Sequence, residues 1–330
     1  MPLTSGATIG PYKIDREIGR GGMGVIFLAH DTRLGRTVAL KALPDDVASD
    51  PDRLQRFERE ARVLASLSHP NIAAIYGLEE ADHRKYLALE HVEGETLADR
   101  IARGALPLPE ALDLCIQIAQ GMEAAHDAGI VHRDLKPANV MVTHQDQVKI
   151  LDFGLAKGRV VTDESGLAKS PAMIDSPTLS SPTLAHSPTF MGTIPGIILG
   201  TAAYLSPEQA RGKVVDRRTD IWSFGCVLYE CLTGHLAFQG ETVSDTIAKI
   251  LERPMDWSAL PKATPPRLRE LLERCLERDP KRRLRDIGDA RITLEEMKAG
   301  RHAGADHAAV PSPEAAAASR RRTAILVALA

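Results

Sequence analysis

Two short polar stretches, separated by apolar residues, place the strongest constraint on how this chain can fold. The first spans residues 132–139 (HRDLKPAN) and the second spans residues 152–154 (DFG). The residues between them form two apolar runs of strand length. A loop, a small hairpin and a second loop would bring three polar side chains to one point: Asp134, Asn139 and Asp152.

These three side chains suit the transfer of a phosphoryl group from ATP to a hydroxyl group. Asp134 can accept the hydroxyl proton, while Asn139 and Asp152 can hold the Mg²⁺ ions that neutralise the phosphates. A lone Asp-Phe-Gly is usually a turn and a lone His-Arg-Asp is mostly chance, whereas the pair at this spacing is far more specific. The stretch resembles the catalytic and Mg²⁺-binding loops of the protein kinase family.

Composition agrees with a soluble enzyme. The 330 residues suit one large domain or two lobes with a tail, and a formal net charge of −3 argues against a general nucleic-acid binder. The four cysteines lie in apolar helical patterns with no Cys-x-x-Cys pair, which favours core thiols in a reducing compartment. The N-terminus lacks the pattern of a signal peptide.

A glycine-rich turn near the N-terminus is the second motif. Residues 19–24 read Gly-Arg-Gly-Gly-Met-Gly, and glycines let a backbone approach phosphate closely and offer it N–H groups. Dinucleotide-binding folds share this pattern, but there it lies between a strand and a helix. Here residues 25–29 are β-branched, aromatic and apolar, which favours a hairpin. The turn resembles the glycine-rich loop of kinases.

Lys41 ends an apolar strand, and a buried ammonium group must be paired. A helix is predicted to follow, with Asp50 as its cap and Pro51 in its first position. Glu60 borders the apolar stripe of this helix and is expected to face inward. By resemblance, Lys41 contacts the α- and β-phosphates and is held by Glu60.

The resemblance implies a nucleotide site between two lobes. Leu89 would stand beside the adenine pocket, and residues 90–92 would form the hinge whose backbone binds adenine. The residues expected to contact ATP are Ile18, Gly19, Gly21, Gly22, Gly24, Val25, Ala39, Lys41, Glu90, Val92 and Met141.

Other positions indicate the serine/threonine class. Lys136 is typical of that version of the catalytic loop, where it contacts the transferring phosphoryl group, and Thr201 matches the threonine that braces the catalytic aspartate. By resemblance Glu208 pairs with Arg283, and Asp220 is structural.

The segment 157–199 is rich in serine and proline and lacks helical periodicity, so we expect a mobile insert in the activation segment. A phosphate on this insert could meet Arg133, which precedes the catalytic aspartate, and order the segment. The candidate acceptors are Thr178, Thr183, Thr189 and Thr193, with the last two favoured.

The predicted organisation is a lead-in (1–11), a kinase domain (12–297, divided near residue 91), a linker (298–319) and a basic-apolar end (320–330). Three arginines followed by apolar residues resemble the cytoplasmic edge of a membrane helix. The run is too short to span a bilayer, which needs ~20 residues. A sticky apolar tail is the alternative, but we favour the start of a truncated membrane helix, whose apolar residues would continue past Ala330.

The sequence thus predicts an α+β, two-lobed kinase of the bacterial, eukaryotic-like serine/threonine type. It would bind ATP and Mg²⁺, modify proteins on Ser/Thr, self-associate to phosphorylate itself, and bind no nucleic acid. One alternative is a pseudokinase scaffold, although Lys41, Asp134 and Asp152 are all retained. Another is a small-molecule phosphotransferase of related fold, although Thr201 and the Ser-Pro-Glu stretch favour a protein substrate.

Overall fold

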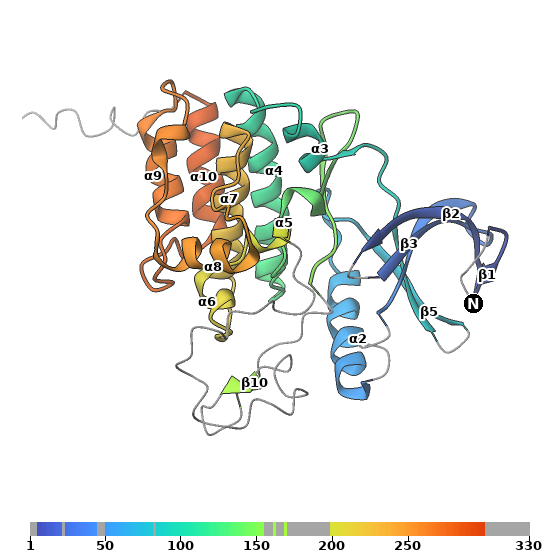
Figure 1. Cartoon of the computed structure of the whole chain (residues 1–330). Coiled ribbons are helices and arrows are strands. Elements are labelled where there is room, and N and C mark those ends of the chain that lie inside the picture. Colours follow the sequence, from blue (N-terminus) through green and yellow to red (C-terminus); the bar gives the residue numbers. More distant parts are fainter. Residues whose placement is uncertain are drawn as a thin grey trace, which may run out of the picture. The chain divides into compact units, whose positions relative to one another are not determined.

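The computed structural model describes residues 5–21, 24–44, 50–81, 84–154, 161–162, 168–169 and 199–300. The chain divides into two compact units, Met1–Leu294 and Glu295–Ala330. All of the functional residues considered below belong to the first unit, which contains a sheet and a group of helices (Figure 1).

An antiparallel sheet of six strands forms the N-terminal lobe, in the order β1-β2-β3-β4-β6-β5. The bounds are β1 (Thr8–Ile9), β2 (Tyr12–Gly21), β3 (Gly24–Asp31), β4 (Arg36–Ala42), β5 (Ile75–Ala81) and β6 (Arg84–Glu90). Alternate side chains of β3 and β4, such as Phe27, Ala29 and Val38, are buried in one core cluster. The remaining side chains of these strands face the other side of the sheet, where a ligand site can form.

Helix α2 (Pro51–Ala65) contacts β5 of this sheet, and the sequence predicts this helix. The Asp50 side chain accepts hydrogen bonds from two backbone N–H groups of the first turn, and Pro51 occupies the first position. The buried face carries Phe57, Ala61 and Leu64. Phe57 and Ala61 belong to a core cluster with Leu43 and Leu87, so apolar packing against the sheet sets the rotation that α2 has in this structure.

The C-terminal lobe is mainly helical and is built around α7 (Arg218–Thr233), which is buried on nearly all sides. It packs between α4 (Leu108–Asp127) and α9 (Pro266–Cys275) (Figure 1). A Cβ on Gly225 would lie 2.8 Å from the Cβ of Cys275, so a glycine is needed for this approach. The other helices are α3 (Leu97–Ile101), α5 (Leu199–Ala202), α6 (Pro207–Ala210), α8 (Val243–Glu252) and α10 (Ile287–Lys298), with short 3₁₀ turns at Pro137–Asn139 and Trp257–Ala259.

A small sheet carries the two polar loops. Strands β8 (Val140–Val142) and β9 (Val148–Ile150) form the predicted hairpin, and β7 (Glu95–Thr96) adds to it. Ile150 also bridges to Ile72 in the loop after α2, so β9 contacts both lobes. Two short strands, β10 (Val161–Thr162) and β11 (Ala168–Lys169), pair within the predicted insert. The four candidate threonines lie outside the described residues.

The four cysteines are buried and unlinked, in agreement with core thiols. Among the helices that the structure describes, none is long and apolar enough to cross a membrane. The basic-apolar residues 320–330 lie outside the described part of the chain.

Candidate active site

Asp220, at the start of α7, holds the backbone of the loop that contains Asp134. Its carboxylate accepts hydrogen bonds from the backbone N–H groups of His132 and Arg133, each at 2.8 Å, and contacts His126 Nε2 at 2.8 Å. Arg133 has a φ of 63°, a left-handed conformation that is costly for a residue with a side chain. Asp220 therefore has the structural role predicted for it, because its bonds hold this backbone in place.

The His132 ring joins the two polar loops. Its Nδ1 accepts a hydrogen bond from the backbone N–H of Asp134 at 3.2 Å, so the proton is on Nε2, which donates to the Leu151 carbonyl at 2.9 Å. The ring also lies 4.5 Å from the Phe153 ring. Complete burial lowers the pKa of His132, which keeps the ring neutral as this hydrogen-bond pattern requires.

Asp134 lies in a cluster of polar side chains from the loop and from α5. Lys136 Nζ donates to Asp134 Oδ2 at 3.0 Å and to Thr201 Oγ1 at 3.3 Å. Asn139 Nδ2 donates to the Asp134 carbonyl at 2.9 Å and to its Oδ2 at 3.2 Å. Because the Asn139 nitrogen is committed to Asp134, its amide oxygen is the atom that it can offer to a metal ion.

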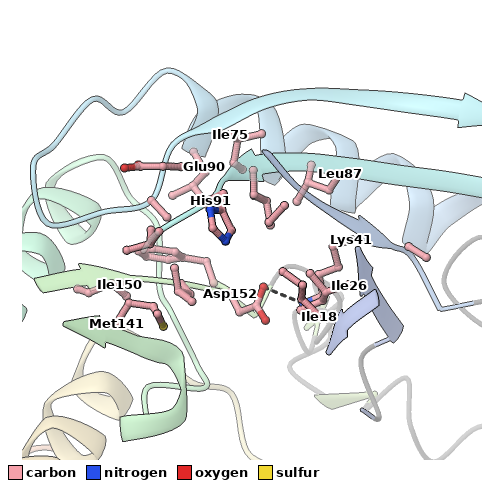
Figure 2. Close-up of a pocket in the computed structure, with 18 of the residues that line it drawn as sticks. Ile18, Ile26, Lys41, Ile75, Leu87, Glu90, His91, Met141, Ile150 and Asp152 are labelled. Carbon is pink, nitrogen blue, oxygen red and sulfur yellow. Dashed lines mark ion pairs between the residues drawn. The ribbon is translucent and has the colours of Figure 1, made fainter. Parts of the chain in front are cut away.

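Asp152 forms an ion pair with Lys41, at 2.8 Å between Oδ1 and Nζ (Figure 2). This pairing differs from the expected one. Among the described residues no ion pair joins Lys41 to Glu60; instead Glu60 lines a second cavity of about 990 Å³. Six arginines line that cavity, which offers Glu60 cations elsewhere, and Asp152 offers Lys41 a nearer carboxylate.

A cavity of about 490 Å³ lies beside Lys41 and Asp152, between the sheet and the β8–β9 hairpin. Most of its lining is apolar, which suits a flat aromatic group with a polar end at the ion pair. Several predicted contact residues line it: Ile18, Ala39, Lys41, Glu90, Val92, Met141 and Asp152. Figure 2 shows most of them converging on one space.

Residues 12–287 match the model of the protein kinase domain family.

The chain belongs to the protein kinase family.

Relatives agree with this assignment. A probable serine/threonine-protein kinase of Streptomyces coelicolor is 40% identical over 302 residues, which cover 90% of this chain and 41% of that protein. PknA of Mycobacterium tuberculosis is 36% identical over 298 residues, covering 88% of this chain and 62% of PknA. The chain thus spans only part of the length of these relatives. The predicted resemblance to bacterial serine/threonine kinases is confirmed.

Solved structures confirm the fold. The crystal structure of the Mycobacterium tuberculosis PknI kinase domain matches with a TM-score of 0.65 and 24% sequence identity, covering 90% of this chain and 99% of that one. At this identity the likeness carries the fold alone. The α+β, two-lobed kinase architecture predicted from the sequence is therefore confirmed.

The structure places one of the predicted contact residues on the other face of the sheet. Ile26, not Val25, lines the cavity beside Lys41. Neighbouring residues of a strand face opposite sides, so Val25 packs with Phe27 and Ala29 on the core face. Ile26 pairs with Lys41 across β3 and β4 and shares its side of the sheet. Counting the antiparallel pairing outward from the turn between Asp31 and Arg36 to Lys41 would have found Ile26.

The glycines stand in the turn between β2 and β3. Gly21 pairs with Gly24, whose φ of 107° and a Cβ position 2.3 Å from the Ala42 carbonyl oxygen require glycine. Gly19 and Gly24 are not among the described residues that line the cavity, and Gly22 lies outside the described residues. Their contact with phosphates therefore stays a prediction.

Arg283 and Glu208 form the ion pair that the sequence predicts, and it is buried. Two guanidinium nitrogens bind the two carboxylate oxygens at 2.7 and 2.9 Å. Arg283 also donates to the backbone carbonyls of Arg218 at 2.7 Å and Glu277 at 2.8 Å. One side chain thus joins α6, the start of α7 and the segment before α10.

Proposed function

We propose that this chain transfers the γ-phosphoryl group of Mg-ATP to serine or threonine hydroxyls of proteins. The observation that carries the proposal is the convergence of Asp134, Lys136 and Asn139 beside the cavity that Lys41 and Asp152 line. Catalysis by these parts is mainly positioning and charge neutralisation.

In this mechanism Asp134 orients the substrate hydroxyl and accepts its proton. Lys136, which lies between Asp134 and Thr201, stabilises negative charge on the transferring group. Lys41 binds the α- and β-phosphates. The backbone of Glu90 and Val92 binds adenine, with Ile18, Ala39 and Met141 against its faces.

Asp152 and Asn139 are the residues proposed to hold Mg²⁺, which neutralises the phosphate charge when bound. Both offer oxygen atoms, the ligands that Mg²⁺ prefers. No cluster of three or more acidic, histidine or cysteine side chains suited to a metal occurs among the described residues. Two protein ligands fit a metal ion held jointly with the phosphates of the nucleotide rather than in a cage of its own.

Nucleotide binding has to rearrange the Lys41–Asp152 ion pair, because both groups are assigned to the nucleotide and its metal ion. We infer that Glu60 then takes the role predicted for it and holds Lys41. Glu60 is half-buried and lies three residues after Phe57 and four before Leu64, so it borders the buried face of α2, and a rotation of the helix would turn it toward the cleft.

Two alternatives are less well supported. A pseudokinase scaffold is disfavoured because Lys41, Asp134 and Asp152 are all retained. Lys41 and Asp152 line the cavity, and Asp134 contacts Asn139, whose carbonyl is bound by the lining residue Leu151. A small-molecule phosphotransferase is disfavoured because Thr201 contacts Lys136, and Ser206 caps α6 with Glu208 in the ion pair described above.

The test is incubation with γ-labelled ATP, Mg²⁺ and a generic basic protein. We expect label on serine or threonine of that protein, and none when Mg²⁺ is chelated. The same incubation without added protein measures phosphorylation of the chain itself. We propose that this reaction requires self-association and that the acceptors are threonines of the insert. Nucleotide binding without any transfer would support the pseudokinase instead.

We also propose that the arginines at 320–322 precede a membrane segment in the full-length protein and lie on its cytoplasmic side. Cells that express the complete gene product would be fractionated, and the kinase is expected in the membrane fraction. Complete recovery in the soluble fraction would contradict the anchor and leave the kinase proposal intact.

A further inference from the structure

Glu90, the last residue of β6, forms hydrogen bonds to Ala74 with both its backbone and its side chain. Its N–H donates to the Ala74 carbonyl at 2.8 Å, and its Oε2 accepts from the Ala74 N–H at 3.0 Å. Both backbone polar groups of Ala74 are therefore bound to Glu90. The carboxylate points away from the nucleotide cavity, which His91 and Val92 line directly after it (Figure 2).

The second partner of this carboxylate is Lys149 in the middle of β9. Its Nζ lies 2.9 Å from Glu90 Oε1 and 3.0 Å from Oε2. The side chains are only 16% and 23% exposed, so solvent weakens this pair less than it weakens an ordinary surface ion pair. Lys149 lies three residues before Asp152.

The loop between α2 and β5 is fixed to the same strand. Ile150 N–H donates to the Asn71 carbonyl at 2.8 Å, and Ala73 N–H donates to the Ile150 carbonyl at 3.0 Å. The Asn71 side chain donates to the Val148 carbonyl at 3.0 Å. Residues 71–74 thus lie between β9 and Glu90 and bind both. The Lys149–Glu90 ion pair joins β9 and Glu90 directly.

We propose that Lys149 is a positioning residue for nucleotide binding. By binding Glu90, Lys149 holds the first residue of the hinge at a fixed position relative to β9. Strand β9 in turn leads to Asp152. Without Lys149, the Glu90 carboxylate keeps only its hydrogen bond from the Ala74 N–H, and water takes the place of the ammonium group. The hinge then loses the charged hydrogen bond between Glu90 and Lys149 that joins the two lobes. The distance between the hinge, which is proposed to bind adenine, and Asp152, which is proposed to bind Mg²⁺, is then no longer fixed. This inference rests on the proposed function.

The test compares Lys149→Met with Lys85→Met. Lys85 is a matched control because it also lies in a strand, is 22% exposed and pairs with the carboxylates of Glu80 and Glu58, but it does not contact Glu90. We expect Lys149→Met to raise the Kd for Mg-ATP and the KM for ATP about tenfold, equal to roughly 1.4 kcal/mol. The KM for the protein substrate should stay near that of the wild type, and Lys149→Arg should restore nucleotide affinity.

A double-mutant cycle separates positioning from general destabilisation. Glu90→Gln and Lys149→Met should each raise the Kd for Mg-ATP, and together they should raise it no further than either alone, because they remove one interaction. Equal Kd values for Lys149→Met and Lys85→Met would overturn the inference, as would additive effects in the cycle. Because calorimetry measures nucleotide binding without transfer, a wild type that binds no Mg-ATP would instead count against the proposed function.

Discussion

Asp134→Asn is expected to lower kcat by about 10²- to 10⁴-fold, the usual contribution of a positioned general base. Asparagine has the same shape as aspartate and keeps one side-chain oxygen. Lys136 and Asn139, which both donate to Asp134 Oδ2 in the wild type, can therefore still donate to it. Asparagine accepts no proton from the substrate hydroxyl, however, so transfer loses its base. The Kd for Mg-ATP should stay close to that of the wild type, because Asp134 is not among the residues that line the nucleotide cavity.

Asp152→Asn serves as the contrasting variant. Asp152 lines the nucleotide cavity and is the proposed carboxylate ligand of Mg²⁺, so this variant should lose transfer and also the Mg²⁺-dependent part of nucleotide affinity. Calorimetry with and without Mg²⁺ distinguishes the two variants, and a labelled-phosphate assay gives kcat. Near-normal phosphorylation by Asp134→Asn would remove the assignment of the base. Equal loss of Mg-ATP binding in both variants would show that Asp134 acts on the nucleotide rather than on the hydroxyl.

Arg283→Met is expected to destabilise the domain by about 3–5 kcal/mol, the typical cost of removing one partner of a buried ion pair. The Arg283 side chain is fully buried and the Glu208 side chain is 8% exposed, so the variant leaves a buried carboxylate without its ion-pair partner. The carbonyls of Arg218 and Glu277 also lose their donor. Denaturation in urea measures the free energy of unfolding, which for most domains is about 5–15 kcal/mol.

Arg269→Met is the matched control. Arg269 pairs with Glu273 on the surface of α9, with both side chains about half exposed, and such pairs contribute about 0–1 kcal/mol. Replacing both members of the buried pair, in Glu208→Leu with Arg283→Met, should recover part of the stability because no charge is left uncompensated. If Arg283→Met unfolds at the same urea concentration as Arg269→Met, the ion pair does not hold these segments together.

The polar loops could be predicted from the sequence because local chain geometry nearly determines them. A short hairpin between residues 139 and 152 leaves few ways to place the flanking loops, and Lys136 and Asn139 contact Asp134 from two and five residues away. Thr201, which is 65 residues from Lys136, contacts that lysine, which in turn contacts the aspartate that Thr201 was predicted to brace. The cap of α2 was readable for the same reason, because Asp50 satisfies N–H groups only a few residues away.

The partner of Lys41 could not be predicted with the same success. Two carboxylates are available to it, and the choice depends on how far α2 is rotated against the sheet. That rotation is set by Phe57, Ala61 and Leu64 against the lobe and by the arginines around Glu60, none of which is local to Lys41. The ion pair between Glu90 and Lys149 was missed because its partners are 59 residues apart and neither belongs to a recognised motif.

The neutral His132 ring has a mechanical consequence. Its two nitrogens bind the Asp134 N–H and the Leu151 carbonyl, and Leu151 is adjacent to Asp152. The proposed base, Asp134, and the proposed metal ligand, Asp152, are therefore linked, because a shift of one loop is transmitted to the other through a rigid aromatic ring. An imidazole cannot stretch or change its length by rotating a bond, as a lysine side chain can. Together with the backbone hydrogen bonds from Leu151 to Asn139 and from Gly154 to His132, the ring therefore holds the two loops at a fixed separation.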